Sequence, residues 1–208
     1  ELGGSEPKVA CVANKDTGGF GREVKWLIDE INAVQPAWNF IGYFDDDFSH
    51  VKNIPSNHCL GGTDVLNEWD ENIALVFAIG NPVVKRKIFQ KIINPKISYP
   101  TLVHPNVCMG KSNVEVGEGS ILCAGTIITV DIQIGKHVIL NLGCTVGHDS
   151  IIGDFSSFMP SVNISGEVTI GEAVYVGTGA KIINQLEIGE ATVVGAGAVV
   201  SKTLPAFC

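Results

Sequence analysis

The chain has 208 residues, a formal net charge of −8, 45% hydrophobic residues and only 7% aromatic residues. This length allows one large or two modest domains with an aliphatic core. The negative charge, with no basic run longer than Lys85, Arg86 and Lys87, argues against nucleic-acid binding through phosphates. No apolar run has membrane-spanning length. The six cysteines form no CxxC pair or close-spaced framework, which indicates reduced thiols in a cytoplasmic protein.

The first half of the chain alternates apolar runs with segments of helical spacing, which predicts a small parallel α/β unit. The expected strands are 8–13, 38–44 and 73–79, and the expected helices are 21–33, 63–69 and a segment that begins at Pro82. Residues 48–62 are rich in Asn, Ser, Pro and Gly and are expected to form a loop. Residues 93–103 are expected to form a linker.

Glycine-rich or acidic segments follow all three expected strands, at Gly18–Gly21, Asp45–Asp47 and Gly80–Asn81. In parallel sheets, ligands bind beyond the carboxyl ends of the strands. Gly19-x-Gly21 is an incomplete dinucleotide fingerprint, so it fits either a tight strand-to-helix turn or a nucleotide-binding cleft. Asp45, about 25 residues further on, adds weight to the cleft.

From Val116 onward, every sixth residue is apolar without a change of register. The fourteen residues that continue this series are Leu122, Ile128, Ile134, Leu140, Val146, Ile152, Phe158, Ile164, Ile170, Val176, Ile182, Ile188, Val194 and Val200. This period predicts a β-helix of flat triangular coils, with three hexads in each coil and five coils over 116–205. Val103 and Met109 fit an imperfect first coil that is offset by one residue. The predicted domains are therefore an α/β unit at 6–100 and a β-helix at 101–208.

His148 is the reactive side chain inside this array. A histidine on a β-helix is often idle, but here Asp149 follows at once and Asn141 stands seven residues earlier. We expect the three to meet at one coil edge, where His148 could act as a general base near neutral pH. Adjacent residues on a strand point to opposite sides, so Asp149 reaches His148 only if the corner breaks this alternation.

The segment from Asn141 to Asp154, Asn-Leu-Gly-Cys-Thr-Val-Gly-His-Asp-Ser-Ile-Ile-Gly-Asp, resembles the active-site segment of bacterial nucleotide-sugar acetyltransferases. These are hexapeptide-repeat enzymes, namely the UDP-amino-sugar N-acetyltransferases and the related sialic acid O-acetyltransferase-like proteins. The segments 18–24, 42–46, 78–81 and 194–200 agree in order and spacing. The resemblance implies a Rossmann-like substrate domain, a left-handed parallel β-helix and a homotrimer. Apolar residues that face outward fit the subunit interface; the candidates are Ile121, Ile127, Ile139 and Ile151.

The resemblance also implies roles for individual residues. His148 corresponds to the general base, and Asp149 and Asn141 assist it. The positions expected to contact the nucleotide sugar are Gly18, Gly19, Phe20, Asp45, Asp46 and Gly80. Those expected to contact acetyl-CoA are Ser157, Thr178 and Ala196. Relatives often carry histidine at the positions of Phe20 and Ser157, and the second of these binds the acyl carbonyl. Cys144 is expected to be structural, and no metal is expected.

The implied reaction is acetyl transfer from acetyl-CoA to the 4-amino group of a nucleotide-linked sugar in bacterial glycan synthesis. One alternative is a sugar O-acetyltransferase of the sialic acid type, because the same base serves a hydroxyl group. Another is a non-catalytic trimer that binds nucleotide sugars. A β-helix carbonic anhydrase fits poorly, because its zinc needs three histidines and the regular coils contain only His137 and His148.

Overall fold

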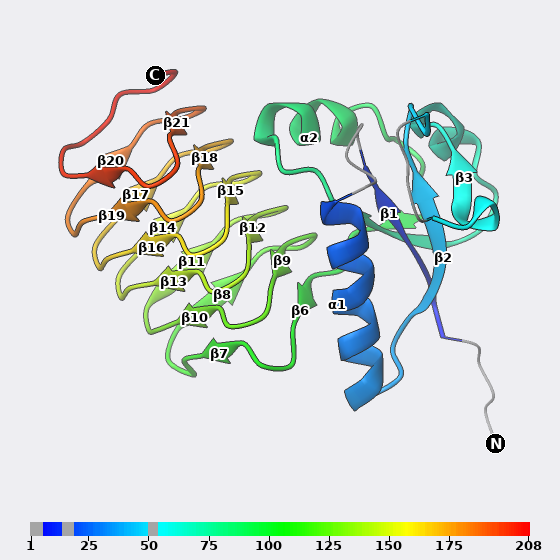
Figure 1. Cartoon of the computed structure of the whole chain (residues 1–208), viewed down its shortest axis with the longest axis horizontal. Helices are drawn as coiled ribbons and strands as arrows, with labels where there is room; N and C mark the ends of the chain where they lie inside the picture. The colour runs from blue at the N-terminus through cyan, green and yellow to red at the C-terminus, as the bar shows by residue number, and fades with distance from the viewer. Residues whose placement is uncertain (1–5, 14–18, 50–53) are drawn as a thin grey trace. The chain divides into compact units, whose positions relative to one another are not determined.

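The computed structural model describes residues 6–13, 19–49 and 54–208, and these form two compact units (Figure 1). The first contains the described residues up to Ile79 together with Lys87–Pro100. The second contains Gly80–Arg86 and Thr101–Cys208. A single domain boundary between residues 100 and 101 remains a prediction. Residues 80–86 form part of the second compact unit, although they precede this boundary in the chain.

The first unit is built on a parallel sheet with the strand order β3-β2-β1-β4-β5. Its strands are β1 (Lys8–Val12), β2 (Asn39–Phe44), β3 (Cys59–Gly61), β4 (Ile73–Phe77) and β5 (Ile97–Ser98). This unit also contains the α-helix α1 (Phe20–Val34) and the 3-10 helices η1 (Ser56–His58) and η2 (Thr63–Glu68). The helix α2 (Pro82–Phe89) is divided, since its residues up to Arg86 belong to the second unit. The strand order reverses between β1 and β4, which is where ligands bind in open α/β sheets.

Burial explains which strands lie at the centre. All five residues of β4 and the last four of β1 are buried, as expected for strands with neighbours on both sides. Two predictions were incomplete. The expected loop 48–62 contains η1 and β3, and the expected linker 93–103 contains β5 and the first strand of the β-helix. These strands are two or three residues long, too short to show an alternating pattern in the sequence.

The second unit is a parallel β-helix with three faces. Face 1 consists of β6 (Leu102–Val103), β9 (Ile121–Leu122), β12 (Ile139–Leu140), β15 (Ser157–Phe158), β18 (Tyr175–Val176) and β21 (Val193–Val194). Face 2 consists of β7 (Cys108–Met109), β10 (Ile127–Ile128), β13 (Thr145–Val146), β16 (Asn163–Ile164), β19 (Lys181–Ile182) and β22 (Val199–Val200). Face 3 consists of β8 (Val114–Val116), β11 (Ile132–Ile134), β14 (Ile151–Ile152), β17 (Thr169–Ile170) and β20 (Glu187–Ile188).

The hexapeptide series fills the interior of these coils, as predicted. Leu122 and the thirteen later members of the series belong to one buried core cluster, and Val116 packs against it. The offset of the first coil also has a cause. Met109 pairs with Ile128, nineteen residues on, whereas Val116 pairs with Ile134, eighteen residues on. The first coil therefore contains one extra residue between β7 and β8.

Three edges join the faces and carry the polar side chains. The corner residues that follow each face 1 strand form the 1–2 edge, and those that follow each face 2 strand form the 2–3 edge. The corner residues that follow each face 3 strand form the 3–1 edge. On the 2–3 edge, the third corner residue of each coil, which is the fourth in the longer first coil, has a positive φ of 54–61°. These residues are Asn113, Asp131, Asp149, Glu167 and Gln185. Asn and Asp tolerate this left-handed conformation better than branched residues do.

The four outward isoleucines predicted for a subunit interface have different environments. Ile121 and Ile139 lie on face 1 and are only 0% and 1% exposed. Ile127 on face 2 and Ile151 on face 3 are 44% and 47% exposed. The prediction was therefore wrong for the first pair, which is already buried within the chain. Sequence alone does not distinguish an outward residue that the chain covers itself from one that it leaves open.

Candidate active site on the 2–3 edge

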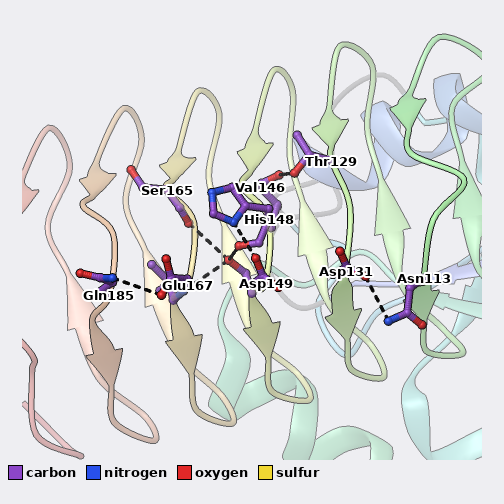
Figure 2. Close-up of polar contacts among 11 residues, drawn as sticks. Asn113, Thr129, Asp131, Val146, His148, Asp149, Ser165, Glu167 and Gln185 are labelled. Atoms are coloured by element: carbon purple, nitrogen blue, oxygen red, sulfur yellow. Dashed lines mark hydrogen bonds and ion pairs between the residues drawn. The ribbon is translucent and has the colours of Figure 1, made fainter.

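His148 and Asp149 form an exposed pair at the end of β13. The imidazole Nδ1 lies 2.7 Å from Asp149 Oδ2, and the two side chains are 56% and 59% exposed. Asp149 has a φ of 57°, so the corner breaks the alternation of a strand and turns this carboxylate toward its neighbour (Figure 2). The structure therefore contains the contact between His148 and Asp149 that such a corner makes possible.

The backbone of this corner is held by the coils on both sides. Asp149 N–H donates to the Val130 carbonyl at 3.2 Å, and the His148 carbonyl accepts from Glu167 N–H at 2.8 Å. Side chains of the third corner position continue the ladder, because Gln185 donates to Glu167 and Asn113 donates to Asp131 (Figure 2). The pair thus projects from a rigid edge, which favours a fixed geometry for its chemistry.

The contact determines which imidazole nitrogen can act as a base. A carboxylate oxygen only accepts hydrogen bonds, so Nδ1 carries the proton that points at Asp149. In the neutral ring, Nε2 then has a free lone pair, and it has no hydrogen-bond partner among the described residues. A histidine held in one tautomer by a carboxylate is a common form of general base.

Asn141 does not join this pair within one chain. It follows β12 on the 1–2 edge, one corner earlier, and its side-chain oxygen accepts from Leu142 N–H at 2.7 Å. The expectation that Asn141, His148 and Asp149 meet at one coil edge is therefore wrong for the single chain. Seven residues exceed one hexad by only one residue, so the two side chains fall on consecutive corners.

The other residues of the 1–2 edge include two predicted acetyl-CoA contacts. Thr178 and Ala196 are both exposed and occupy the same corner position in successive coils. The Thr178 carbonyl accepts from Gly197 N–H at 2.8 Å, which ties the two coils together. Cys144 on this edge is 1% exposed, and burial raises the pKa of its thiol to about 11. A neutral buried thiol agrees with a structural role.

The predicted contact between Ser157 and the acyl carbonyl is contradicted. Ser157 lies on face 1 and is 0% exposed, because Lys85 of α2 covers it. Lys85 Nζ donates to Ser157 Oγ at 3.0 Å and is itself 1% exposed. Burial holds the pKa of this lysine well below its usual value. Next to it, Arg86 forms ion pairs with Glu172 and Glu190 on the 3–1 edge.

A second histidine of the β-helix has a different environment. His137 on the 3–1 edge is 1% exposed and stacks on Phe155, with ring centroids 5.1 Å apart. Burial, and secondarily the nearby charge of Lys85, lowers its pKa to about 4. Sequence reasoning did not connect His137 with Lys85, because the lysine is 52 residues away in the chain and belongs to a different kind of element.

Part of the predicted nucleotide loop can be described. Gly18 lies outside the described residues. Gly19 precedes α1, and its carbonyl accepts from Arg22 and Glu23 at the first turn. Phe20 is the first residue of the helix and is partly buried. A Cβ at Gly21 would lie 3.3 Å from the Tyr43 ring, so this glycine permits close packing of α1 on the sheet.

The acidic residues after β2 have structural contacts. Asp45 is 1% exposed, and its carboxylate accepts from Asp47 N–H. Asp46 accepts from both the N–H and the hydroxyl of Thr63, at 2.7 and 2.9 Å, which fixes the start of η2. Asp46 also lines an open depression of about 760 Å³; its other lining residues are Gly62, Thr63, Asp64, Asn67, Ile88, Lys91 and Ile92. Gly80 lies in the other unit, where a Cβ built on it would be 3.7 Å from the Met159 side chain.

Across residues 6–13, 19–49 and 54–208, no three or more His, Cys, Asp and Glu side chains cluster in a way that could hold a metal ion. Within the same residues, no helix has the length and apolar character needed to cross a bilayer.

The fold and the edge pair define a class of protein: a β-helix acyltransferase with an attached α/β domain. Comparisons narrow this class. The PglD N-terminal domain family matches residues 17–92. A GDP-perosamine N-acetyltransferase of Escherichia coli O157:H7 is 27% identical over 149 residues, which is 72% of this chain and 67% of that protein.

Solved structures extend the match over both units. PerB from Caulobacter crescentus, in complex with CoA and GDP-perosamine, is 28% identical with a TM-score of 0.81, covering 99% of this chain and 92% of that one. WeeI from Acinetobacter baumannii AYE is 30% identical with a TM-score of 0.81, covering 96% and 94%. The chain belongs to the hexapeptide-repeat family of nucleotide-sugar acetyltransferases, and its β-helix is the left-handed one of that family.

Proposed function

We propose that this protein transfers the acetyl group of acetyl-CoA to the 4-amino group of a nucleotide-linked 4-amino-4-deoxy sugar in bacterial glycan synthesis. The observation that carries the proposal is the His148–Asp149 contact, which leaves Nε2 as the available base on an exposed edge. The names of two relatives, a GDP-perosamine N-acetyltransferase and a structure with CoA and GDP-perosamine, make GDP-perosamine the first acceptor to test.

The proposed reaction exchanges a C–S bond for a C–N bond and moves one proton from nitrogen to sulfur. The sugar amine attacks the thioester carbonyl, the C–N bond forms and the C–S bond breaks, and the sulfur takes up the proton that passes through His148, so that CoA leaves as a thiol. The nitrogen must lose a proton, and His148 Nε2 accepts it. Asp149 stabilises the imidazolium that results and keeps the ring oriented. The attack needs no covalent acyl-enzyme, which agrees with the buried Cys144 thiol.

The nucleotide handle belongs to the first unit in this proposal. We assign Gly18, Gly19 and Phe20 to the phosphates; Gly19 and Phe20 stand at the start of α1, and a helix N-terminus favours anions. Asp45 and Asp46 lie near the base, and Gly80 lies near the sugar. The depression beside Asp46 offers space for a nucleoside, and Lys91 supplies a cation at its rim.

The proposed acetyl-CoA contacts require a homotrimer. Thr178 and Ala196 are on the 1–2 edge, whereas His148 is on the 2–3 edge of the same chain. A threefold axis facing face 2 would bring the 2–3 edge of one subunit beside the 1–2 edge of the next, where Asn141 also lies. Exposed apolar residues on face 2 support this arrangement, since Ile127 and Val199 are 44% and 65% exposed. Buried between subunits, they would lose contact with water.

We also propose a cytoplasmic location. All six cysteines are free thiols, and three of them are buried. Free thiols persist in a reducing compartment, where acetyl-CoA is also available. Measuring the distribution of the protein between cytoplasmic and periplasmic fractions tests this point, and recovery in the periplasm would contradict it.

The decisive experiment measures thiol release from acetyl-CoA with a panel of GDP-, UDP- and dTDP-linked 4-amino sugars and with sugar alcohols that lack the amine. We expect release with at least one amine and a product heavier by one acetyl group. Treatment with hydroxylamine distinguishes the products, because it cleaves an O-acetyl ester and leaves an amide intact. Release only with sugar alcohols would establish O-acetylation instead. Binding of nucleotide sugar without release by any acceptor would favour the non-catalytic trimer.

A further inference from the structure

The coil that follows His148 carries a glycine at the same corner position. The residues aligned with His148 along the 2–3 edge are Ser112, Val130, Gly166, Asn184 and Lys202, at intervals of eighteen. Gly166 is the one glycine in this series, and it is buried although its neighbours Ser165 and Glu167 are exposed. The imidazole of His148 lies over Gly166.

The distances show what this glycine permits. A Cβ built at Gly166 would lie 2.5 Å from His148 Nε2, 2.7 Å from Cε1 and 2.9 Å from Cδ2. All three distances are below the shortest that carbon atoms normally reach in proteins, so a side chain at Gly166 and the observed imidazole cannot coexist. The φ of Gly166 lies outside the left-handed region, so its backbone does not itself require glycine.

Gly119 on the 3–1 edge also faces a histidine ring, that of His137, but its φ of 72° itself favours glycine. Two other corner glycines, Gly147 and Gly153, meet backbone atoms instead. A Cβ at Gly153 would lie 2.5 Å from the backbone of Gly171, and one at Gly147 would lie 2.6 Å from the backbone nitrogen of Gly166. Those glycines allow the coils to stack, and the backbone cannot move aside. At Gly166 the three nearest atoms all belong to the His148 side chain, which can rotate away. Packing of the fold therefore does not account for this glycine.

We propose that Gly166 is a positioning residue: its missing side chain lets the His148 imidazole lie against the next coil while Nδ1 contacts Asp149. A methyl group at this position forces the ring to rotate, which separates Nδ1 from the carboxylate and moves Nε2. The effect on turnover rests on the proposed function, whereas the effect on the ring does not. A displacement of about 1 Å in a reacting group can cost about 10²-fold in rate.

The first test concerns the ring alone. Long-range ¹H–¹⁵N correlation spectra of the full chain show which imidazole nitrogen carries the proton when His148 is neutral. We expect the Nδ1–H tautomer in the unsubstituted protein and a shift toward Nε2–H in Gly166→Ala. An unchanged tautomer in Gly166→Ala would overturn the proposal. This measurement requires no substrate, so it stays informative if no acceptor sugar is found.

The second test uses turnover. Gly166→Ala should lower kcat by about 10²-fold with little change in the KM for the nucleotide sugar, because the ring and not the binding site is displaced. Asn184→Ala, at the same corner position one coil further on, is the matched control and should keep the normal rate. Retained turnover in Gly166→Ala would overturn the positioning role while leaving the acetyl-transfer proposal intact.

A double-mutant cycle separates positioning from folding. In the His148→Ala background the methyl group at Gly166 has no ring to meet, so Gly166→Ala should change neither the residual rate nor the Tm. If Gly166→Ala lowers the Tm equally with and without His148, the glycine is needed for coil packing, and the proposal is wrong. If neither the unsubstituted protein nor any variant transfers acetyl groups, but the tautomer changes as expected in Gly166→Ala, then the proposed function is rejected. The positioning of the ring by Gly166 is retained in that case.

Discussion

The 2–3 edge and the 3–1 edge of the β-helix each carry a histidine, and the two have opposite environments. His148 is 56% exposed and contacts Asp149, whereas His137 is 1% exposed and stacks on Phe155. The residue eighteen positions later accounts for the difference. After His137 this residue is Phe155, and after His148 it is Gly166. In a stacked fold, the next coil decides whether a corner side chain is covered or left available.

The largest expected effect comes from removing the exposed imidazole. His148→Asn should lower turnover by at least about 10²-fold, because the base is lost. Asn184 already occupies the same corner position two coils later, so asparagine suits this backbone and the proposed homotrimer should persist. Thiol release measures the rate, and sedimentation measures the assembly. Near-normal turnover would show that His148 is not the base.

Removing the buried imidazole should affect acid stability instead. The pKa of His137 is about 4 in the folded chain, compared with 6.5 for the free side chain, so the unfolded chain binds the proton more tightly. The stability is complete above pH 6.5 and is lost as the pH falls toward 4, by about 3 kcal/mol. His137→Phe introduces the residue type that Phe155 already provides at the same corner position, and it should lose less stability on acidification.

Urea unfolding at pH 7 and pH 4 measures this difference between the two proteins. Turnover near neutral pH should be unaffected by His137→Phe, since the 3–1 edge takes no part in the proposed reaction. Equal acid sensitivity of both proteins would mean that the burial of His137 does not contribute to pH-dependent stability.

A smaller effect is expected for the carboxylate of the exposed pair. Asp149→Asn retains the backbone conformation, because Asn113 has the same positive φ in the ladder. The amide can still accept a hydrogen bond, but it no longer stabilises the imidazolium by its charge. We expect about a tenfold decrease in kcat, which corresponds to about 1.4 kcal/mol of transition-state stabilisation. A decrease as large as that of His148→Asn would assign Asp149 a more direct role.

The smallest effect concerns Lys85, whose charge lies close to His137. Lys85→Met should raise the pKa of His137 only part of the way from about 4 toward 6.5, because burial is the larger cause. Proton NMR of the His137 imidazole measures this change. A complete return of His137 to 6.5 would show that the charge outweighs burial.

Tertiary contacts also decided which outward side chains are buried, which the hexapeptide pattern of the sequence does not show. Ser157 and Thr145 occupy equivalent outward positions in their hexads, yet only Ser157 is fully covered, because Lys85 donates to it from α2. Likewise Asn141 falls on the corner before His148, although a spacing of seven suggested one edge. Lys85, which covers Ser157, lies 72 positions away in the chain, so a six-residue pattern gives no sign of this contact.

The sequence by itself determined the β-helix, because an apolar residue at every sixth position leaves one arrangement that buries all of them in a common core. It also placed His148 and Asp149 at a corner. Only the tertiary structure decided that these two side chains touch, since the contact depends on the left-handed backbone of Asp149. It likewise decided that His137 is sealed and His148 is open, because stacking joins residues eighteen apart, and each pair of coils has its own side chains.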